Sequence, residues 1–238
     1  MNIPKDCIII GGGISIIEGT SLGLKEKIKD KCIFLTNYSY KHFEGTILCF
    51  TDKDFYVPDY AKRKEIREKY PDIYNELKNL PLIIGLQKNN GIEEFLHPNT
   101  YLIDCPKKEL TKKPPLTGIF ALTIAEKIGF NRMWLLGFDW SRQPIPKDKT
   151  KYNSHNGGQI HYYNDIKHKG TGYTGYFDIH NPNDYFKFFD NSKIYNVSLN
   201  SNIQNFKKIS YQEMFQLLDN KIYNQNELRD LIKKIILL

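Results

Sequence analysis

The chain has 238 residues, of which 40% are hydrophobic and 13% aromatic, enough apolar mass for one sizeable core. Its 34 basic and 27 acidic residues give a formal charge of +7, which favours anionic partners such as nucleotides or nucleic acid. No apolar run approaches the roughly 20 residues that span a bilayer, and the first residues lack the pattern of a signal peptide. We therefore expect a cytoplasmic protein without a membrane partner, with one domain over residues 1–238.

Short apolar runs, each followed by small or polar residues, recur along the chain and predict strands. These predicted strands cover residues 6–10, 31–37, 45–52, 81–86, 100–105, 132–139 and 193–201. Predicted helices lie between or after them, at residues 62–80, 117–128, 211–220 and 231–238. This alternation predicts an α/β fold, a Rossmann-like and mostly parallel sheet with helices on both faces.

Cysteine and histidine spacing gives no sign of a zinc site. The four cysteines have no CxxC spacing, and three of them lie in apolar strand-like runs, so we expect buried free thiols. Four of the six histidines fall between residues 141 and 183, but their spacing matches no zinc signature. A histidine there could instead act as a general base.

Residues 141–183 interrupt the regular pattern. They have almost no apolar periodicity, but they hold five glycines and four histidines directly after the predicted strand that ends at Asp139. Long segments of this kind inside a compact domain are usually functional or disordered. We expect a lid-like insert within the single domain.

The first glycine motif follows the first predicted strand. Residues 11–15 read Gly-Gly-Gly-Ile-Ser, and glycines at this position let backbone N–H groups approach a phosphate. The motif is neither GxGxxG nor a Walker loop, and a plain tight turn would also explain it. Phosphate contact and a simple turn both stay open.

Polar residues end three other predicted strands, and an open α/β sheet binds ligands at such strand ends. Asn37 could hydrogen-bond a base or ribose, or it could form an Asx turn. Asp52, with Asp54 two residues later, could hold Mg²⁺ through carboxylate oxygens, or it could belong to a polar turn. Asp139, at the end of the predicted strand 132–139, would lie in the same ligand-binding cleft at the strand ends.

Several segments together resemble a known family. They are GGGIS, TNY, FTDKDF, LTGIFALTIAEKIGFNRMWLLGFDW, HYYND and IYNVSLNSNIQNFKKIS, and they span roughly residues 7–215. In this order they resemble the MptE-like 6-hydroxymethylpterin pyrophosphokinase family. They are also similar to the Cst-type sialyltransferases of glycosyltransferase family 42. Both resemblances imply a Rossmann-like fold that binds a nucleotide.

The sialyltransferase resemblance implies a set of nucleotide-binding residues. Gly11, Gly13 and Ser15 match the glycine loop of those enzymes, whereas Gly12 and Ile14 depart from it. Asn37 falls on the asparagine that contacts the cytidine nucleotide, and Thr117 and Gly118 fall on the Ser-Gly pair before a helix. We include Gly12 in this expected nucleotide site.

The resemblance also implies catalytic residues. His180 takes the place of the sialyltransferase base, and Asp139 and His161 are further catalytic candidates. Ser141 stands where those enzymes have a phosphate-binding tyrosine, so Tyr162 or another tyrosine of the insert would have to supply that hydroxyl. Residues 161–165 resemble a loop of phage-type MptE-like proteins, which adds Asp165 to the site.

The metal expectation depends on which relative is followed. Asp52 replaces a sialyltransferase asparagine but agrees with the aspartate of the MptE-like group, and aspartate suits Mg²⁺. A glycosyltransferase reading therefore requires no cofactor, whereas a pyrophosphokinase reading requires Mg²⁺.

Three functions follow from these observations. The leading hypothesis is a glycosyltransferase that moves a sugar from a CMP- or NDP-sugar to a hydroxyl acceptor. The second is a Mg²⁺-dependent pyrophosphokinase that transfers from ATP to a hydroxymethyl group, such as that of a pterin. The third, suggested by the charge of +7, is a basic protein that binds or modifies nucleic acid.

Overall fold

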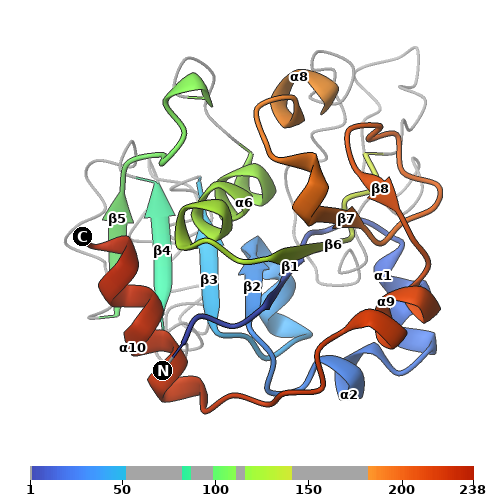
Figure 1. Cartoon of the computed structure of the whole chain (residues 1–238), viewed down its shortest axis with the longest axis horizontal. Helices are drawn as coiled ribbons and strands as arrows, with labels where there is room; N and C mark the ends of the chain where they lie inside the picture. The colour runs from blue at the N-terminus through green and yellow to red at the C-terminus, as the bar shows by residue number, and fades with distance from the viewer. Residues whose placement is uncertain (1, 52–81, 87–98, 111–115, 141–181) are drawn as a thin grey trace, which may run out of the picture.

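The structure is a computed structural model that describes residues 2–51, 82–86, 99–110, 116–140 and 182–238. Their centre is one eight-stranded sheet (Figure 1). The strands are β1 (Asp6–Ile10), β2 (Ile33–Thr36), β3 (Ile47–Phe50), β4 (Ile83–Leu86), β5 (Thr100–Ile103), β6 (Arg132–Leu136), β7 (Ile194–Asn196) and β8 (Lys207–Lys208). Every neighbouring pair is parallel, which confirms the predicted α/β Rossmann-like fold.

The strand order is β5-β4-β3-β2-β1-β6-β7-β8, so the chain reverses its direction of travel across the sheet between β1 and β6. Residues Asp6 to Ile10 of β1 pair with Arg132 to Leu136 of β6 along the whole strand. In open α/β sheets, ligands bind outside the carboxyl ends of the strands at such a reversal point. The loops after β1 and β6 are therefore the first place to look for a site.

Helices cover both faces of the sheet. One face carries α6 (Thr117–Ile128) and α10 (Gln225–Ile236), and the other carries α1 (Ile16–Ser21), α2 (Leu24–Ile28) and α9 (Tyr211–Leu217). Helix α8 (Pro182–Phe186) lies in a connection, as do the 3₁₀ helices of the described residues, η1 (Asn37–Lys41), η4 (Lys108–Leu110) and η6 (Asn191–Lys193).

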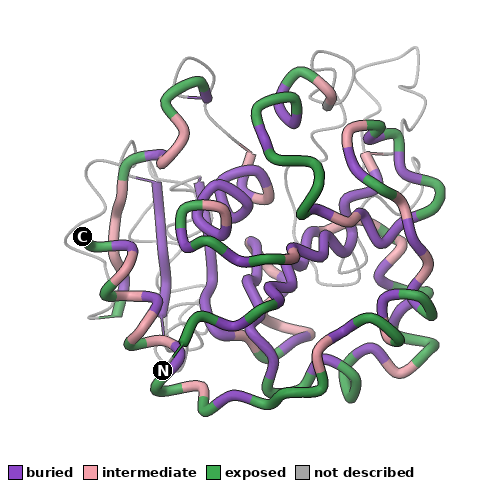
Figure 2. Tube along the Cα trace, viewed as in Figure 1, coloured by how far each residue is buried: buried purple, intermediate pink, exposed green. Residues whose placement is uncertain are grey.

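Strand alternation explains why the core has two layers. Cys7 and Ile9 of β1 belong to the cluster beneath α6 and α10, whereas Ile8 and Ile10 belong to the cluster beneath α1, α2 and α9. Because side chains alternate between faces, a strand covered on both sides reads as a continuous apolar run. Figure 2 shows β1 to β4 buried, while the edge strand β5 is only partly buried.

Most predicted elements are confirmed, with shifted ends. The helix predicted at 117–128 is α6, which ends at Ile128 and is followed by Gly129 with φ +91, a conformation that favours glycine. The strand predicted at 193–201 is β7, which is shorter because the chain turns at residues 198–201, where the N–H of Ser201 donates to the carbonyl of Ser198. Helix α10 begins at Gln225, earlier than predicted, because the Asn224 side chain caps it.

Some expectations are confirmed and others lie outside the described residues. All four cysteines are buried and free, as predicted. Within the described ranges no helix is long and apolar enough to cross a membrane. The helix predicted at 62–80 lies outside these ranges, and so does nearly all of the expected insert.

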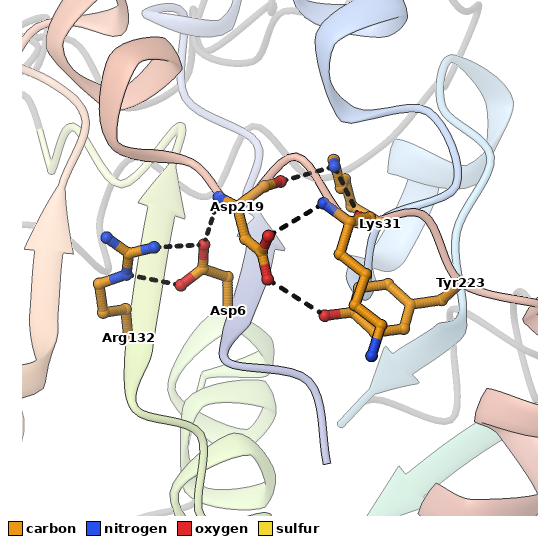
Figure 3. A network of polar contacts seen from close by, with 6 residues as sticks. Asp6, Lys31, Arg132, Asp219 and Tyr223 are labelled. Atoms are coloured by element: carbon orange, nitrogen blue, oxygen red, sulfur yellow. Dashed lines mark hydrogen bonds and ion pairs between the residues drawn. The ribbon is translucent and has the colours of Figure 1, made fainter. Parts of the chain in front are cut away.

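A polar network fastens the segment before α10 to the amino ends of the strands (Figure 3). Arg132 donates from Nε and Nη2 to the carboxylate of Asp6, at 2.6 and 2.8 Å, and the backbone N–H of Asp219 donates to the same carboxylate. Lys31 Nζ donates to the carbonyls of Asp219 and Lys221, at 2.6 and 2.7 Å. This network lies at the edge of the sheet opposite to the carboxyl ends of β1 and β6.

Candidate functional site

The loops that follow β1 and β6 are bonded to each other. The Asp139 carboxylate is 7% exposed and accepts two hydrogen bonds from Ser15, from the backbone N–H at 2.8 Å and from the hydroxyl at 2.5 Å. The N–H groups of Gly11 and Gly13 donate to the carbonyls of Leu136 and Gly137, at 2.7 and 2.8 Å. Three predicted site residues, Ser15, Gly13 and Asp139, are thus brought together.

The spacing of these two loops requires glycine. A Cβ on Gly13 would overlap the Asp139 carboxylate and would lie 2.6 Å from the carbonyl oxygen of Gly137. A Cβ on Gly11 would lie 2.7 Å from the same oxygen. Gly137 has φ +69, which L side chains rarely adopt. Close approach of two loops accounts for these glycines without any phosphate.

Three backbone N–H groups of the glycine loop are therefore already used in hydrogen bonds. The N–H groups of Gly11, Gly13 and Ser15 all point to β6 or its loop and donate there. These three amides are therefore not available to an anion at this edge of the sheet. This geometry favours the simple turn over phosphate contact for those three amides.

Helix α6 offers other backbone N–H donors. Its N-cap residue is Leu116, which makes no side-chain capping bond, and the first bond within the helix runs from Phe120 N–H to the Leu116 carbonyl. The N–H groups of Thr117, Gly118 and Ile119 precede that bond and have no hydrogen-bond acceptor among the described residues. The positive end of a 12-residue helix dipole lies at the same place.

A chain of polar side chains lies beside the start of α6. The Thr117 hydroxyl donates to the side-chain oxygen of Asn37 at 3.1 Å, and it lies 2.8 Å from the hydroxyl of Thr51. Since a hydroxyl has one proton, Thr51 donates to Thr117 while Thr117 donates to Asn37. This fixes the Asn37 amide with its oxygen turned to Thr117, which leaves its NH₂ group as a donor on the opposite side.

The neighbouring strand ends support this arrangement. The Thr36 hydroxyl donates to the carbonyl of Ile10 at 2.8 Å, tying the end of β2 to the end of β1. The turn after β2 is closed by the Ser39 hydroxyl, which accepts from the N–H of Thr36. Asn37 itself has φ +47, a conformation that asparagine adopts more readily than most residues. Because Ser39 closes the turn, the Asn37 side chain does not take part in that turn.

The ring of Phe138 lies beneath the loop after β1 and the start of α6. A Cβ on Gly118 would lie 2.8 Å from the Phe138 ring, and a Cβ on Gly11 would lie 3.1 Å from the same ring. Phe138 therefore sits between the loop after β1 and the start of α6. Gly118 lets the first turn of the helix come down onto this ring.

Tyr211 is a buried titratable group near Ser15 that the sequence did not reveal. Its side chain is 1% exposed, its ring packs against Gly19, and its hydroxyl makes no well-formed hydrogen bond with the described residues. Burial raises the pKa of Tyr211, and the nearby Asp139 carboxylate raises it further, while the Ser15 side chain opposes the shift. The phenol therefore stays protonated throughout the neutral range.

The remaining predicted site residues lie outside the described residues. They are Asp52, His161, Tyr162, Asp165 and His180. Among the residues that the structure does describe, no cluster of three or more histidine, cysteine, aspartate or glutamate side chains could hold a metal. Gly12, also predicted, lies within the described loop between Gly11 and Gly13.

A pocket of about 360 Å³ opens elsewhere, between the segment that follows β5 and the C-terminal residues. It is lined by residues 103–106, Lys127 and residues 236–238. It contains none of the predicted site residues.

Comparison of the chain with protein-family models, with curated proteins and with solved structures gave no significant match. The family resemblance seen in the sequence therefore stays a prediction.

Proposed function

We propose that the protein is a nucleotide-donor-dependent transferase, a glycosyltransferase that moves a sugar from a CMP- or NDP-sugar to a hydroxyl acceptor. The observation that carries this proposal is the uncapped start of α6, which opens beside the Thr51, Thr117 and Asn37 side chains at the carboxyl edge of the sheet. Backbone N–H groups at a helix start and neutral hydroxyls together suit an anionic phosphate.

Four residues of the site, Thr117, Gly118, Asn37 and Asp139, have separate roles in this proposal. The N–H groups of Thr117 and Gly118 donate to the donor phosphate, where the helix dipole also favours negative charge. The Asn37 NH₂ group donates to an acceptor atom of the ribose or base, because its oxygen is already engaged by Thr117. Asp139 holds the glycine loop through Ser15 and acts as a positioning residue rather than as the base.

The transfer step itself needs a base. The acceptor oxygen attacks the anomeric carbon of the sugar while the bond from that carbon to the phosphate oxygen breaks and the nucleotide leaves with the bonding electrons. The acceptor proton passes to His180, the predicted base, which lies outside the described residues. The donors at the start of α6 stabilise the negative charge that develops on the departing phosphate.

The test is a turnover assay with CMP-, UDP- and GDP-sugars, with and without a chelator. We expect release of CMP or of one nucleoside diphosphate without added metal. We expect Thr117→Val to reduce kcat/KM by roughly 5-fold, since the lost hydroxyl bond is worth about 1 kcal/mol. Thr123→Val is the matched control: its hydroxyl bonds the Phe120 carbonyl within the same helix. Equal activity of Thr117→Val and wild type would contradict the proposed site.

Two other results would redirect the proposal. Turnover that requires both ATP and Mg²⁺, with a hydroxymethyl acceptor and without any sugar transfer, would replace it by the pyrophosphokinase. Binding of DNA or RNA that weakens steeply with salt, without turnover of any nucleotide sugar, would replace it by the nucleic-acid protein.

A further inference from the structure

Thr51 has a buried hydroxyl beside the start of α6 to which the transfer step gives no role. The residue follows β3 directly, and its side chain is 2% exposed. Its hydroxyl lies 2.8 Å from the hydroxyl of Thr117 and has no other hydrogen-bond partner among the described residues. Because a hydroxyl buried away from water needs an acceptor for its proton, the Thr51 proton goes to Thr117.

One arrangement of protons satisfies all three side chains, those of Thr51, Thr117 and Asn37. The Thr51 proton goes to Thr117, and the Thr117 proton then goes to the Asn37 oxygen, 3.1 Å away. If the Asn37 NH₂ group donated to Thr117 instead, either the Thr51 or the Thr117 proton would lack an acceptor among the described residues. An unpaired buried donor costs at least as much as the lost bond, so the Asn37 NH₂ group stays turned away from Thr117.

Thr51 also restricts the rotamer of Thr117. A threonine in a helix divides its side chain between two rotamers, because its hydroxyl can also bond a backbone carbonyl of the preceding turn. Thr117 is the first residue of α6, whereas Thr51 is fixed at the end of a strand that is buried throughout. The contact with Thr51 therefore selects the Thr117 rotamer that faces Asn37.

We propose that Thr51 is a positioning residue of the nucleotide site: it orients Thr117, which in turn presents the Asn37 NH₂ group to an acceptor atom of the ribose or base. This inference rests on the proposed function, because it takes Asn37 as a contact of the bound nucleotide. Asn37 is only partly buried, unlike the two threonines behind it. The site then favours a ligand atom that accepts a hydrogen bond at Asn37 over one that donates.

The test measures nucleotide Kd by calorimetry for wild type, Thr51→Val and Thr51→Ser. The probes are CMP, UDP, GDP and ATP. We expect Thr51→Val, which removes the hydroxyl and nearly keeps the shape, to weaken the nucleotide that binds by about 5-fold, the effect of one lost hydrogen bond. Thr51→Ser keeps the hydroxyl and should bind within about 2-fold of wild type.

A double-mutant cycle separates positioning from a general structural effect. Asn37→Gly removes the side chain, and glycine adopts the φ of +47 at this position without strain. Because Thr51 acts through Asn37, adding Thr51→Val to Asn37→Gly should leave Kd unchanged. A substitution that only disturbed the fold would weaken binding equally in both backgrounds.

Thr46 provides the matched control at the other end of β3. It is fully buried at the amino edge of the sheet, where its hydroxyl accepts from the Ile33 N–H at 3.0 Å and donates to the side-chain oxygen of Gln225 at 2.9 Å. Thr46→Val should lower the melting temperature of the free protein, because it leaves two buried groups unpaired, and it should leave nucleotide Kd unchanged.

The contrary results are separable. Wild-type Kd in Thr51→Val, or a Thr51→Ser variant as weak as Thr51→Val, would overturn the positioning role and leave the proposed function standing. The same loss with and without the Asn37 side chain, or an equal loss in Thr46→Val, would also overturn it, because Thr51 would then act on the fold in general. Failure of wild type to bind any of the four nucleotides would overturn the proposed function itself.

Discussion

The carboxylate of Asp139 accepts both hydrogen bonds that Ser15 can donate, from the backbone N–H to Oδ2 and from the hydroxyl to Oδ1. These two residues are 124 positions apart in sequence, and their bonds close the gap between the loops after β1 and β6. Asp139, which the sequence suggested as a catalytic residue, thus holds the glycine loop of residues 11–15 in place. The donors available to an anion lie instead at the start of α6.

Asp139→Asn tests this fastening. The amide oxygen still accepts from the Ser15 N–H, and the NH₂ group can donate to the Ser15 hydroxyl oxygen, but both bonds lose their charged partner. We therefore expect the free energy of unfolding to fall by about 1 to 2 kcal/mol. Ser15→Ala, which removes only the hydroxyl bond, should cost about 1 kcal/mol. Urea unfolding measures both, and a double mutant whose loss equals the sum of the two would show that the residues are not coupled.

Gly13→Ala tests whether the glycine loop is fixed by contact. Its Cβ would overlap the Asp139 carboxylate and the Gly137 carbonyl, and neither loop can retreat without breaking its hydrogen bonds, so we expect a loss of about 3 kcal/mol. Gly129→Ala is the control, since a Cβ there meets nothing within 4 Å and the cost is backbone strain of about 1 kcal/mol. A smaller loss for Gly13→Ala than for Gly129→Ala would refute the close approach.

Lys31→Met tests the network at the amino edge of the sheet. The substitution leaves the carbonyls of Asp219 and Lys221 without their donor, and we expect the unfolding free energy to fall by about 2 to 4 kcal/mol. Hydrogen exchange should speed up at the N–H of Tyr223, which donates to Asp30 nearby. Lys27→Met, at an exposed position of α2, should change stability by less than about 0.5 kcal/mol, and equal effects of the two variants would contradict the network.

The pH dependence of stability tests Asp219. A hydrogen bond from the Lys221 N–H, aided by the charge of Lys31, holds the pKa of Asp219 below its ordinary value. Because the folded-state pKa is depressed, the stabilisation is present above the ordinary pKa of about 3.9 and is lost as the pH falls through the folded-state pKa. Asp219→Asn should therefore flatten the fall in melting temperature below pH 4, while costing less than about 1 kcal/mol at pH 7 because the side chain is partly exposed. Parallel curves for the two proteins would contradict this assignment.

The fold could be predicted because its signals are local. Runs such as residues 7–10 are apolar throughout, which is typical of strands covered on both faces, and α6 ends where a glycine follows it. Strand β8 was not predicted: two lysines carry no apolar pattern, and they become a strand only because they pair with Tyr195 and Asn196 of β7. Its existence depends on tertiary contact.

The site was harder to predict because its contacts are distant in sequence. Asn37 and Thr117 were predicted as site residues from their positions at a strand end and a helix start. Thr51 was not predicted, because its contact with the Thr117 hydroxyl exists only in the folded chain. The glycines were recognised, but the close approach of Gly11 and Gly13 to the loop after β6 exists only in the folded chain.

The most direct test of the nucleotide site at the start of α6 is the melting temperature of wild type, Thr117→Val and Thr123→Val with CMP, UDP, GDP and ATP, each with and without Mg²⁺. A ligand at 100 times its Kd stabilises the fold by about 2.7 kcal/mol, which raises the melting temperature by roughly 5 °C or more for a chain of this size. We predict a metal-independent rise with CMP or UDP that is smaller in Thr117→Val and intact in Thr123→Val. No rise with any nucleotide, or an equal rise in all three proteins, would contradict the site.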